Sequence, residues 1–105
     1  MTRIYLSGKI TGLTKEEYTR NFDRAEQFYK AAGFEVVNPV TIGEKLLETN
    51  PDSSYEDFMK VDLEALRTCT HIAMITGWET SPEARRELKE AERLGLEVMQ
   101  LKFII

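Results

Sequence analysis

The sequence predicts an α/β fold, a flavodoxin- or Rossmann-like three-layer sandwich built on a mostly parallel sheet of four strands in the order 2-1-3-4. Short apolar, β-branched segments alternate along the chain with longer segments that carry an apolar stripe. This alternation is typical of strands joined by right-handed helical crossovers, which place helices on both faces of a parallel sheet. The 105 residues suit a single domain, residues 1–105.

The predicted strands are short and lie between turn-forming residues. They cover Arg3–Ser7, residues 34–38, His71–Ile75 and residues 96–105. Helical periodicity is found in residues 15–32, 55–68 and 82–94, and Gly33 and Gly95 follow the first and last of these helices. Pro39 ends the second strand because proline cannot donate to the ladder. We expect residues 40–54 to be the least regular part, with one helical turn over residues 42–47 and a loop that faces the substrate.

Two loops are expected to meet at the carboxyl ends of the first and third strands. In a doubly wound sheet, the connections leave these neighbouring strands in opposite directions, which opens a crevice between them. The first loop comprises Gly8, Lys9, Ile10, Thr11 and Gly12. Its glycines let backbone N–H groups approach a ligand, although such a pair marks an ordinary turn more often than a phosphate cradle. The second loop turns at Gly77 and enters the last helix through Ser81, its predicted N-cap.

Two carboxylates interrupt the apolar stripes of otherwise regular helices. Glu87 falls on the apolar stripe of the last helix, and Asp62 projects from the middle of the stripe of residues 55–68. A carboxylate in such a position costs several kcal/mol unless it is partnered or used. Glycosyl transfer needs a nucleophile for an anomeric carbon and a second group for the leaving side, which this pair would supply. Tyr5 is placed to orient Glu87, although each residue alone also fits a structural role.

Composition excludes several classes of protein. The net charge is −4 and the basic residues are scattered, which argues against a nucleic-acid polymer as partner. No apolar run approaches the roughly 18 residues of a membrane span. Cys69 is the single cysteine, so no internal disulfide forms and a cytoplasmic location is expected. His71 has no second ligand-type neighbour, and we expect neither a metal nor an organic cofactor.

Several segments resemble the nucleoside 2-deoxyribosyltransferase superfamily, in particular its small uncharacterised branch, often phage or bacterial, that borders the 2′-deoxynucleoside 5′-phosphate N-hydrolases. The similar segments are residues 4–12, Asn38-Pro39, Asp62-Leu63, Gly77-Trp78 and residues 81–91, in the same order over nearly the whole chain. The resemblance implies a nucleoside or nucleotide as the small-molecule partner. It also implies a homodimer or larger homo-oligomer, in which a neighbouring subunit often completes the pocket.

The resemblance further implies roles for single residues. Glu87 corresponds to the nucleophile, Asp62 to the acid that handles the leaving base and the sugar, and Tyr5 to the residue that orients the nucleophile. Ser81 matches a serine that contacts the 5′-phosphate in the nucleotide hydrolases, and the loop of residues 8–12 lies at the same ligand. Asn38 and Trp78 are further candidate substrate-binding residues, with Trp78 either a lid over a flat base or a core anchor.

The leading prediction is therefore an enzyme, a nucleoside deoxyribosyltransferase or a nucleotide N-glycosidase, that forms a covalent glycosyl intermediate on Glu87. The alternative is a non-catalytic nucleotide-binding module that uses the same crevice, since Pro82, Glu83 and Arg85 stand where relatives tend to have small residues. A purely structural accessory protein is a third possibility.

The sequence contains features for and against a ligand with a 5′-phosphate. Ser81 and Lys9 favour a 5′-monophosphate, which is the preferred expectation, whereas Glu83 opposes one. The outcome depends on where the Glu83 side chain points. A homodimer is also expected because apolar side chains are candidates for an exposed surface at Trp78, Phe103, Ile104 and Ile105.

Overall fold

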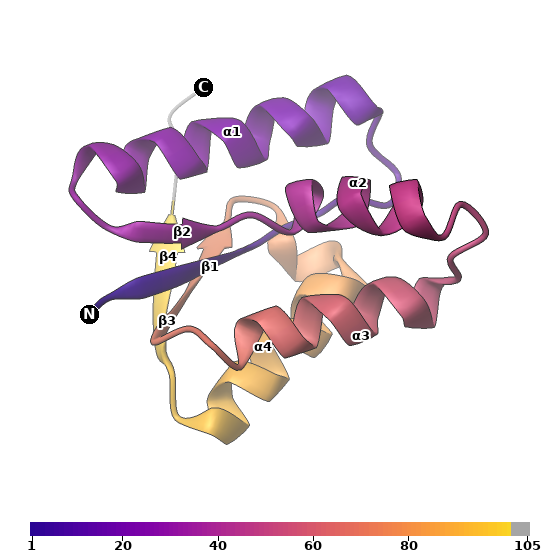
Figure 1. Ribbon diagram of the computed structural model, residues 1–105. Coiled ribbons are helices and arrows are strands. Elements are labelled where there is room, and N and C mark those ends of the chain that lie inside the picture. Colours follow the sequence, from indigo (N-terminus) through magenta and orange to yellow (C-terminus); the bar gives the residue numbers. More distant parts are fainter. Residues whose placement is uncertain (102–105) are drawn as a thin grey trace.

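A parallel sheet forms the centre of the computed structural model, which describes residues 1–101 (Figure 1). Its strands are β1 (Arg3–Ser7), β2 (Glu35–Val37), β3 (His71–Ile75) and β4 (Glu97–Leu101). The order is β2-β1-β3-β4 and all three pairings are parallel, which confirms the predicted fold class and strand order. The part of the last strand predicted beyond residue 101, with Phe103, Ile104 and Ile105, lies outside the described residues.

Helices cover both faces of this sheet (Figure 1). They are α1 (Lys15–Ala31), α2 (Pro39–Thr49), α3 (Tyr55–Leu66) and α4 (Pro82–Leu94), with a short 3₁₀ helix, η1 (Trp78–Thr80), before α4. Alternate residues of a strand point to opposite faces, so Ile4 and Leu6 of β1 pack in the cluster that contains α1. Tyr5 packs in the opposite cluster, which contains residues of α3 and α4. Across residues 1–101, no helix is long and apolar enough to cross a membrane.

The expectation for residues 40–54 was wrong in its extent, because most of this segment is the 11-residue helix α2. The side chain of Asn38 accepts a hydrogen bond from the backbone N–H of Val40 at 2.9 Å, and Pro39 occupies the first helical turn. Asparagine followed by proline is a favourable helix start, since proline has no N–H to leave unsatisfied there. The same Pro39 that ends the second strand therefore begins a helix directly.

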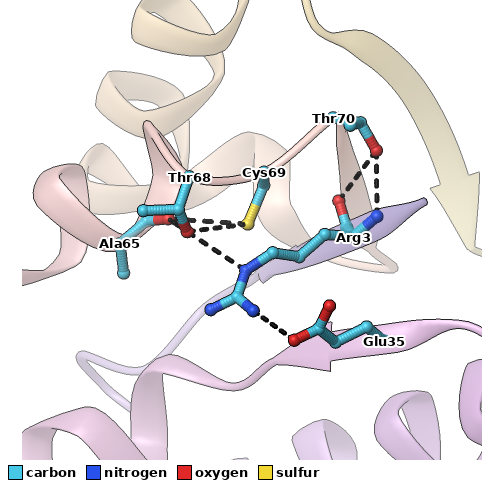
Figure 2. Close-up of polar contacts among 6 residues, drawn as sticks. All are labelled: Arg3, Glu35, Ala65, Thr68, Cys69 and Thr70. Atoms are coloured by element: carbon cyan, nitrogen blue, oxygen red, sulfur yellow. Dashed lines mark hydrogen bonds and ion pairs between the residues drawn. The ribbon is translucent and has the colours of Figure 1, made fainter. Parts of the chain in front are cut away.

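A polar cluster holds together the amino end of the sheet (Figure 2). The Arg3 guanidinium donates to the Thr68 hydroxyl at 3.1 Å and pairs with the Glu35 carboxylate on β2. The Arg3 backbone N–H donates to the Thr70 hydroxyl at 3.0 Å, which ties β1 to the turn between α3 and β3. Such partly exposed contacts are individually weak. Together they connect β1, β2 and the turn before β3 at the amino ends of the strands, opposite to the carboxyl ends.

We predict that Asn38→Ala lowers the free energy of unfolding by about 1–2 kcal/mol. Asn38 is buried, caps α2 and donates from its amide to the Glu26 carboxylate at 3.0 Å, so alanine leaves two polar groups without their partner. Urea unfolding followed by circular dichroism measures the change. Asn50→Ala, an exposed position at the other end of α2, is the control and should cost less than about 0.5 kcal/mol. Equal losses for the two variants would contradict the capping role.

Candidate active site

A pocket of about 400 Å³ lies beside the carboxyl end of β1. Gly8, Ile10 and Thr11 contribute from the loop after β1, while the remaining walls come from α1, α2, α3 and α4. The loop passes close to the core at Gly8, where a Cβ would lie 3.1 Å from the Ile75 side chain and 3.3 Å from the Phe22 ring, so a larger residue would require these side chains to shift. The pocket is lined by Gly8, Ile10, Thr11, Lys15, Tyr18, Phe22, Pro39, Val40, Gly43, Glu44, Leu47, Tyr55, Phe58, Met59, Asp62, Glu83 and Glu87.

Glu87 of α4 is a buried carboxyl group that reaches this pocket. The Tyr5 hydroxyl donates to its Oε2 atom at 2.5 Å, and the Ser7 hydroxyl donates to its Oε1 atom at 2.7 Å. Tyr5 and Ser7 are two residues apart on β1, so the pleat directs both toward the face that α4 covers. The strand thus holds both oxygens of one carboxyl group in a defined orientation.

Asp62 of α3 lines the same pocket but lacks comparable support. Its Oδ1 atom is buried and has no hydrogen-bond partner among the described residues. Burial raises the pKa of Asp62 to about 7, because the low-dielectric surroundings disfavour its charged form. Asp62 can therefore carry a proton at neutral pH and offer it to a ligand.

The environment of Glu87 also favours its protonated form. Burial is the largest cause and the negative charge of Asp62 adds to it, while the hydrogen bonds from Tyr5 and Ser7 act in the opposite direction. The net effect raises the pKa of Glu87 from its ordinary 4.5 to about 8. Burial and the nearby carboxyl groups raise the pKa of Tyr5 well above 10, so its hydroxyl remains a hydrogen-bond donor. Two such carboxyl groups in one pocket titrate as a pair rather than separately.

A third carboxylate, Glu83, lies one helical turn before Glu87 at the start of α4. It accepts a hydrogen bond from the Thr11 hydroxyl at 2.5 Å and another from the Ser81 hydroxyl at 3.1 Å. Ser81 is also the N-cap of α4, since its Oγ atom accepts from the Ala84 N–H at 3.1 Å. Burial acts to raise the pKa of Glu83, but the hydrogen bonds from Thr11 and Ser81 prevail and hold it below its usual value. Glu83 is therefore ionised at neutral pH and links the loop after β1 to α4.

The rest of the pocket is largely apolar. Rings and aliphatic chains from three helices line it, namely Tyr18, Phe22, Val40, Leu47, Tyr55, Phe58 and Met59. Lys15 is the cation among the lining residues, where Glu44 adds a further acid. Such a wall suits a flat, weakly polar group such as a nucleobase, for which aromatic contact gives favourable stacking.

The structure brings the candidate catalytic residues together: Glu87 and Asp62 line one pocket, and Tyr5 binds Glu87. Of the candidate binding residues, Gly8, Ile10 and Thr11 line the pocket. Ser81 contacts the pocket only through Glu83. The candidates outside the pocket lining are Lys9, Gly12, Asn38 and Trp78.

The surroundings of Trp78 correspond to a core anchor rather than a lid. Its ring is partly buried against the cluster that contains Tyr5, and its indole N–H donates to the Gln100 side chain at 3.0 Å. Asn38 caps α2 as described above. Both residues therefore have roles in the fold that account for their positions.

Sequence reasoning missed Ser7 as a residue of the site and left the direction of the Glu83 side chain open. Ser7 shares the β1 face of Tyr5, so alternation along the strand would have indicated it. The inward direction of Glu83 had no signal in the sequence, because its partner Thr11 belongs to a loop 72 positions earlier. Among residues 1–101, no group of three or more His, Cys, Asp or Glu side chains could hold a metal ion.

Fold and site together define a parallel α/β domain whose pocket, beside the central strand, contains the buried Glu87 and the partly buried Asp62. The chain belongs to the family described as "Domain of unknown function (DUF4406)", which matches residues 2–100. A search of curated proteins finds no match. A CMP N-glycosidase from Clostridium botulinum, BcmB, is similar in structure, with a TM-score of 0.63 and 21% sequence identity over 96% of this chain and 69% of that chain. At this identity, the similarity establishes the shared fold.

We predict that the free energy of unfolding falls by roughly 2–4 kcal/mol between about pH 5 and pH 8 through Glu87. The pKa of Glu87 is raised from 4.5 to about 8 in the folded chain, so the folded state binds more protons than the unfolded state in this window. The contribution of Glu87 to the free energy of unfolding is therefore fully present below pH 4.5 and is lost as the pH rises through 8. Glu87→Gln removes this loss, which urea unfolding at several pH values measures.

Glu92→Gln, an exposed change on the same helix, is the matched control and should follow the pH dependence of the unaltered chain. A Glu87→Gln curve that runs parallel to the unaltered chain would show that Glu87 is not protonated in the folded state.

Proposed function

We propose that the protein cleaves or transfers the N-glycosidic bond of a (deoxy)nucleoside or nucleoside 5′-monophosphate through a covalent glycosyl intermediate on Glu87. The observation that carries this proposal is the buried Glu87 carboxyl group, oriented by the Tyr5 and Ser7 hydroxyls and exposed to a pocket that also contains Asp62. The likeness of the fold to a CMP N-glycosidase supports the same reaction class. In this role Glu87, Asp62 and Tyr5 are the catalytic group.

In the first step, an ionised Glu87 oxygen attacks C1′ of the sugar. The bond between C1′ and the base nitrogen breaks, its electron pair stays on the base, and protonated Asp62 donates its proton to the leaving base. In the second step, a water molecule or another base attacks C1′ and releases Glu87, while ionised Asp62 takes up the proton of the attacking group. Atoms and charge balance over the two steps, and Asp62 ends in its starting form.

Hydrogen bonds favour the protonation state that the reaction requires, and burial of Glu87 opposes them. The Tyr5 and Ser7 hydroxyls both donate to Glu87, whereas the buried Oδ1 atom of Asp62 has no donor in the described part of the chain. Donors stabilise a carboxylate, so they favour the charge on Glu87. Burial outweighs them and raises the pKa of Glu87 to about 8, above the value of about 7 for Asp62, so ionised Glu87 beside protonated Asp62 is the minor protonation state at neutral pH. The apolar wall from α1, α2 and α3 would hold the base beside this pair.

The second candidate function is a nucleotide-binding module without turnover. It is favoured by the pKa of Glu87 near 8, since a largely protonated carboxyl group at neutral pH binds a sugar hydroxyl but does not attack C1′. Such a module would show ligand-induced stabilisation in thermal unfolding without any release of base.

We predict that the unaltered chain releases free base from at least one member of a panel of deoxyribonucleosides, ribonucleosides and their 5′-monophosphates. Glu87→Gln should lower the rate by at least about 10³-fold, because the nucleophile is lost. Tyr5→Phe should lower it roughly 10- to 100-fold, since one hydrogen bond to a charged group is worth about 1.5–3 kcal/mol. Chromatographic detection of base measures these rates, with Glu92→Gln as the control expected to retain activity.

A covalent intermediate can be sought directly by mass spectrometry of protein quenched during turnover. The added mass should equal one glycosyl group and lie on the peptide that contains Glu87. No release of base from any panel member, or equal release by Glu87→Gln, would overturn the proposed activity.

We predict a bell-shaped dependence of kcat/KM on pH with a maximum near neutral pH. Activity requires Glu87 ionised and Asp62 protonated, and their pKa values are raised to about 8 and about 7 in the free protein. Asp62→Asn removes the negative charge that raises the pKa of Glu87, so the acidic limb should move to lower pH and the alkaline limb should disappear. A profile of Asp62→Asn that keeps both limbs in place would exclude Asp62 as the acid.

A further inference from the structure

We propose that Glu83 is a specificity-determining residue that makes the pocket accept a nucleoside with a free 5′-hydroxyl and reject the 5′-monophosphate. This inference rests on the proposed function, because it places the sugar between Glu87 and the start of α4. It reverses the preference for a monophosphate that the sequence favours. The reason is the direction of the Glu83 side chain, which lines the pocket and accepts a hydrogen bond from Thr11 in the loop after β1.

The two side-chain hydroxyl groups at this end of the pocket already donate to Glu83. The Thr11 hydroxyl donates its hydrogen to one carboxylate oxygen at 2.5 Å, and the Ser81 hydroxyl donates to the other at 3.1 Å. A hydroxyl group has one hydrogen to donate, so a phosphate in this position would find both donors engaged. Glu83 thus supplies internally the negative charge that a phosphate would otherwise bring to the helix start.

The charges of the pocket oppose a second anion. Four carboxyl groups line it: Glu83 and Glu87 from α4, Asp62 from α3 and Glu44 from α2. Hydrogen bonds hold the pKa of Glu83 below its usual value, so it is charged at neutral pH. Lys9, the cation expected to assist phosphate binding, is absent from the lining, and the cation that does contribute is Lys15 of α1. A phosphate dianion would therefore enter a net negative site.

The position of Glu83 along α4 relates it to the 5′ side of the sugar. It lies four residues before Glu87 on the same helical face, a displacement of about 6 Å. The base belongs on the apolar wall from α1, α2 and α3, so a sugar with C1′ at Glu87 presents its C5′ side toward the start of α4. Each carboxylate oxygen can accept two hydrogen bonds, and Glu83 keeps a free acceptor position for a 5′-hydroxyl. One residue then attracts the nucleoside and repels the nucleotide.

The test compares each nucleoside with its own 5′-monophosphate in the unaltered chain and in Glu83→Gln. We expect kcat/KM of the unaltered chain to favour the nucleoside by at least about tenfold, and Glu83→Gln to shift this ratio toward the monophosphate by at least about tenfold. The shift should be larger at low salt, where charges are less screened. Glu92→Gln makes the same change in net charge at an exposed position of α4 and should leave the ratio as it is.

A parallel binding measurement separates this inference from the proposed activity. Calorimetric titration of the same ligand pairs uses Glu87→Gln, which does not turn them over, and the double variant Glu83→Gln with Glu87→Gln. The inference is supported if Glu87→Gln binds the nucleoside more tightly than the monophosphate and if the double variant reduces this ratio of affinities at least about tenfold. This result would support the inference even if the unaltered chain releases no base.

Three results would overturn the inference. The first is an unaltered chain that favours the monophosphate, and the second is a nucleoside-to-monophosphate ratio that changes equally in Glu83→Gln and Glu92→Gln. In both cases, base release by the unaltered chain leaves the proposed activity standing. The third is the absence of both binding and turnover for every pair, which would overturn the inference and the activity together.

Discussion

The carboxyl group of Glu87, buried between α4 and β1, is the constraint on which the rest of the site depends. An ionisable group in this position is unfavourable unless donors meet it, and the Tyr5 and Ser7 hydroxyls do so. Their spacing requires that β1 remains a regular strand up to Ser7 and that α4 packs across its carboxyl end. The geometry of the candidate nucleophile thus follows directly from the central pairing of the sheet.

Polar side chains make different kinds of contact at the two ends of the sheet. At the amino end, Arg3 links β1, β2 and the turn before β3 through hydrogen bonds and an ion pair with Glu35 (Figure 2). At the carboxyl end, the polar groups of β1 are directed to Glu87 and the pocket. A firmly connected amino end leaves the loops at the opposite end available for a ligand, as is general for parallel α/β sheets.

Two carboxylates on one face of α4 have opposite electrostatic environments. Burial and the charge of Asp62 raise the pKa of Glu87, whereas hydrogen bonds from Thr11 and Ser81 lower that of Glu83. One group can therefore hold or release a proton near neutral pH, and the other remains an anion. Pairs of acids whose surroundings separate their pKa values in this way are found where two roles must be performed side by side.

Local sequence patterns determined the fold class, the strand order and the unusual positions of Glu87 and Asp62, because strand alternation and helical periodicity are visible within a few turns of chain. The extent of α2 was missed, since Pro39 was interpreted as the end of a strand and Asn38 as a candidate binding residue, and neither as the start of a helix. Tertiary structure alone decided that Ser7 joins Tyr5 at Glu87 and that Glu83 turns inward to Thr11. The physical reason is that periodicity tells which side of a helix or strand a residue occupies, whereas its partner depends on how segments far apart in the chain pack together.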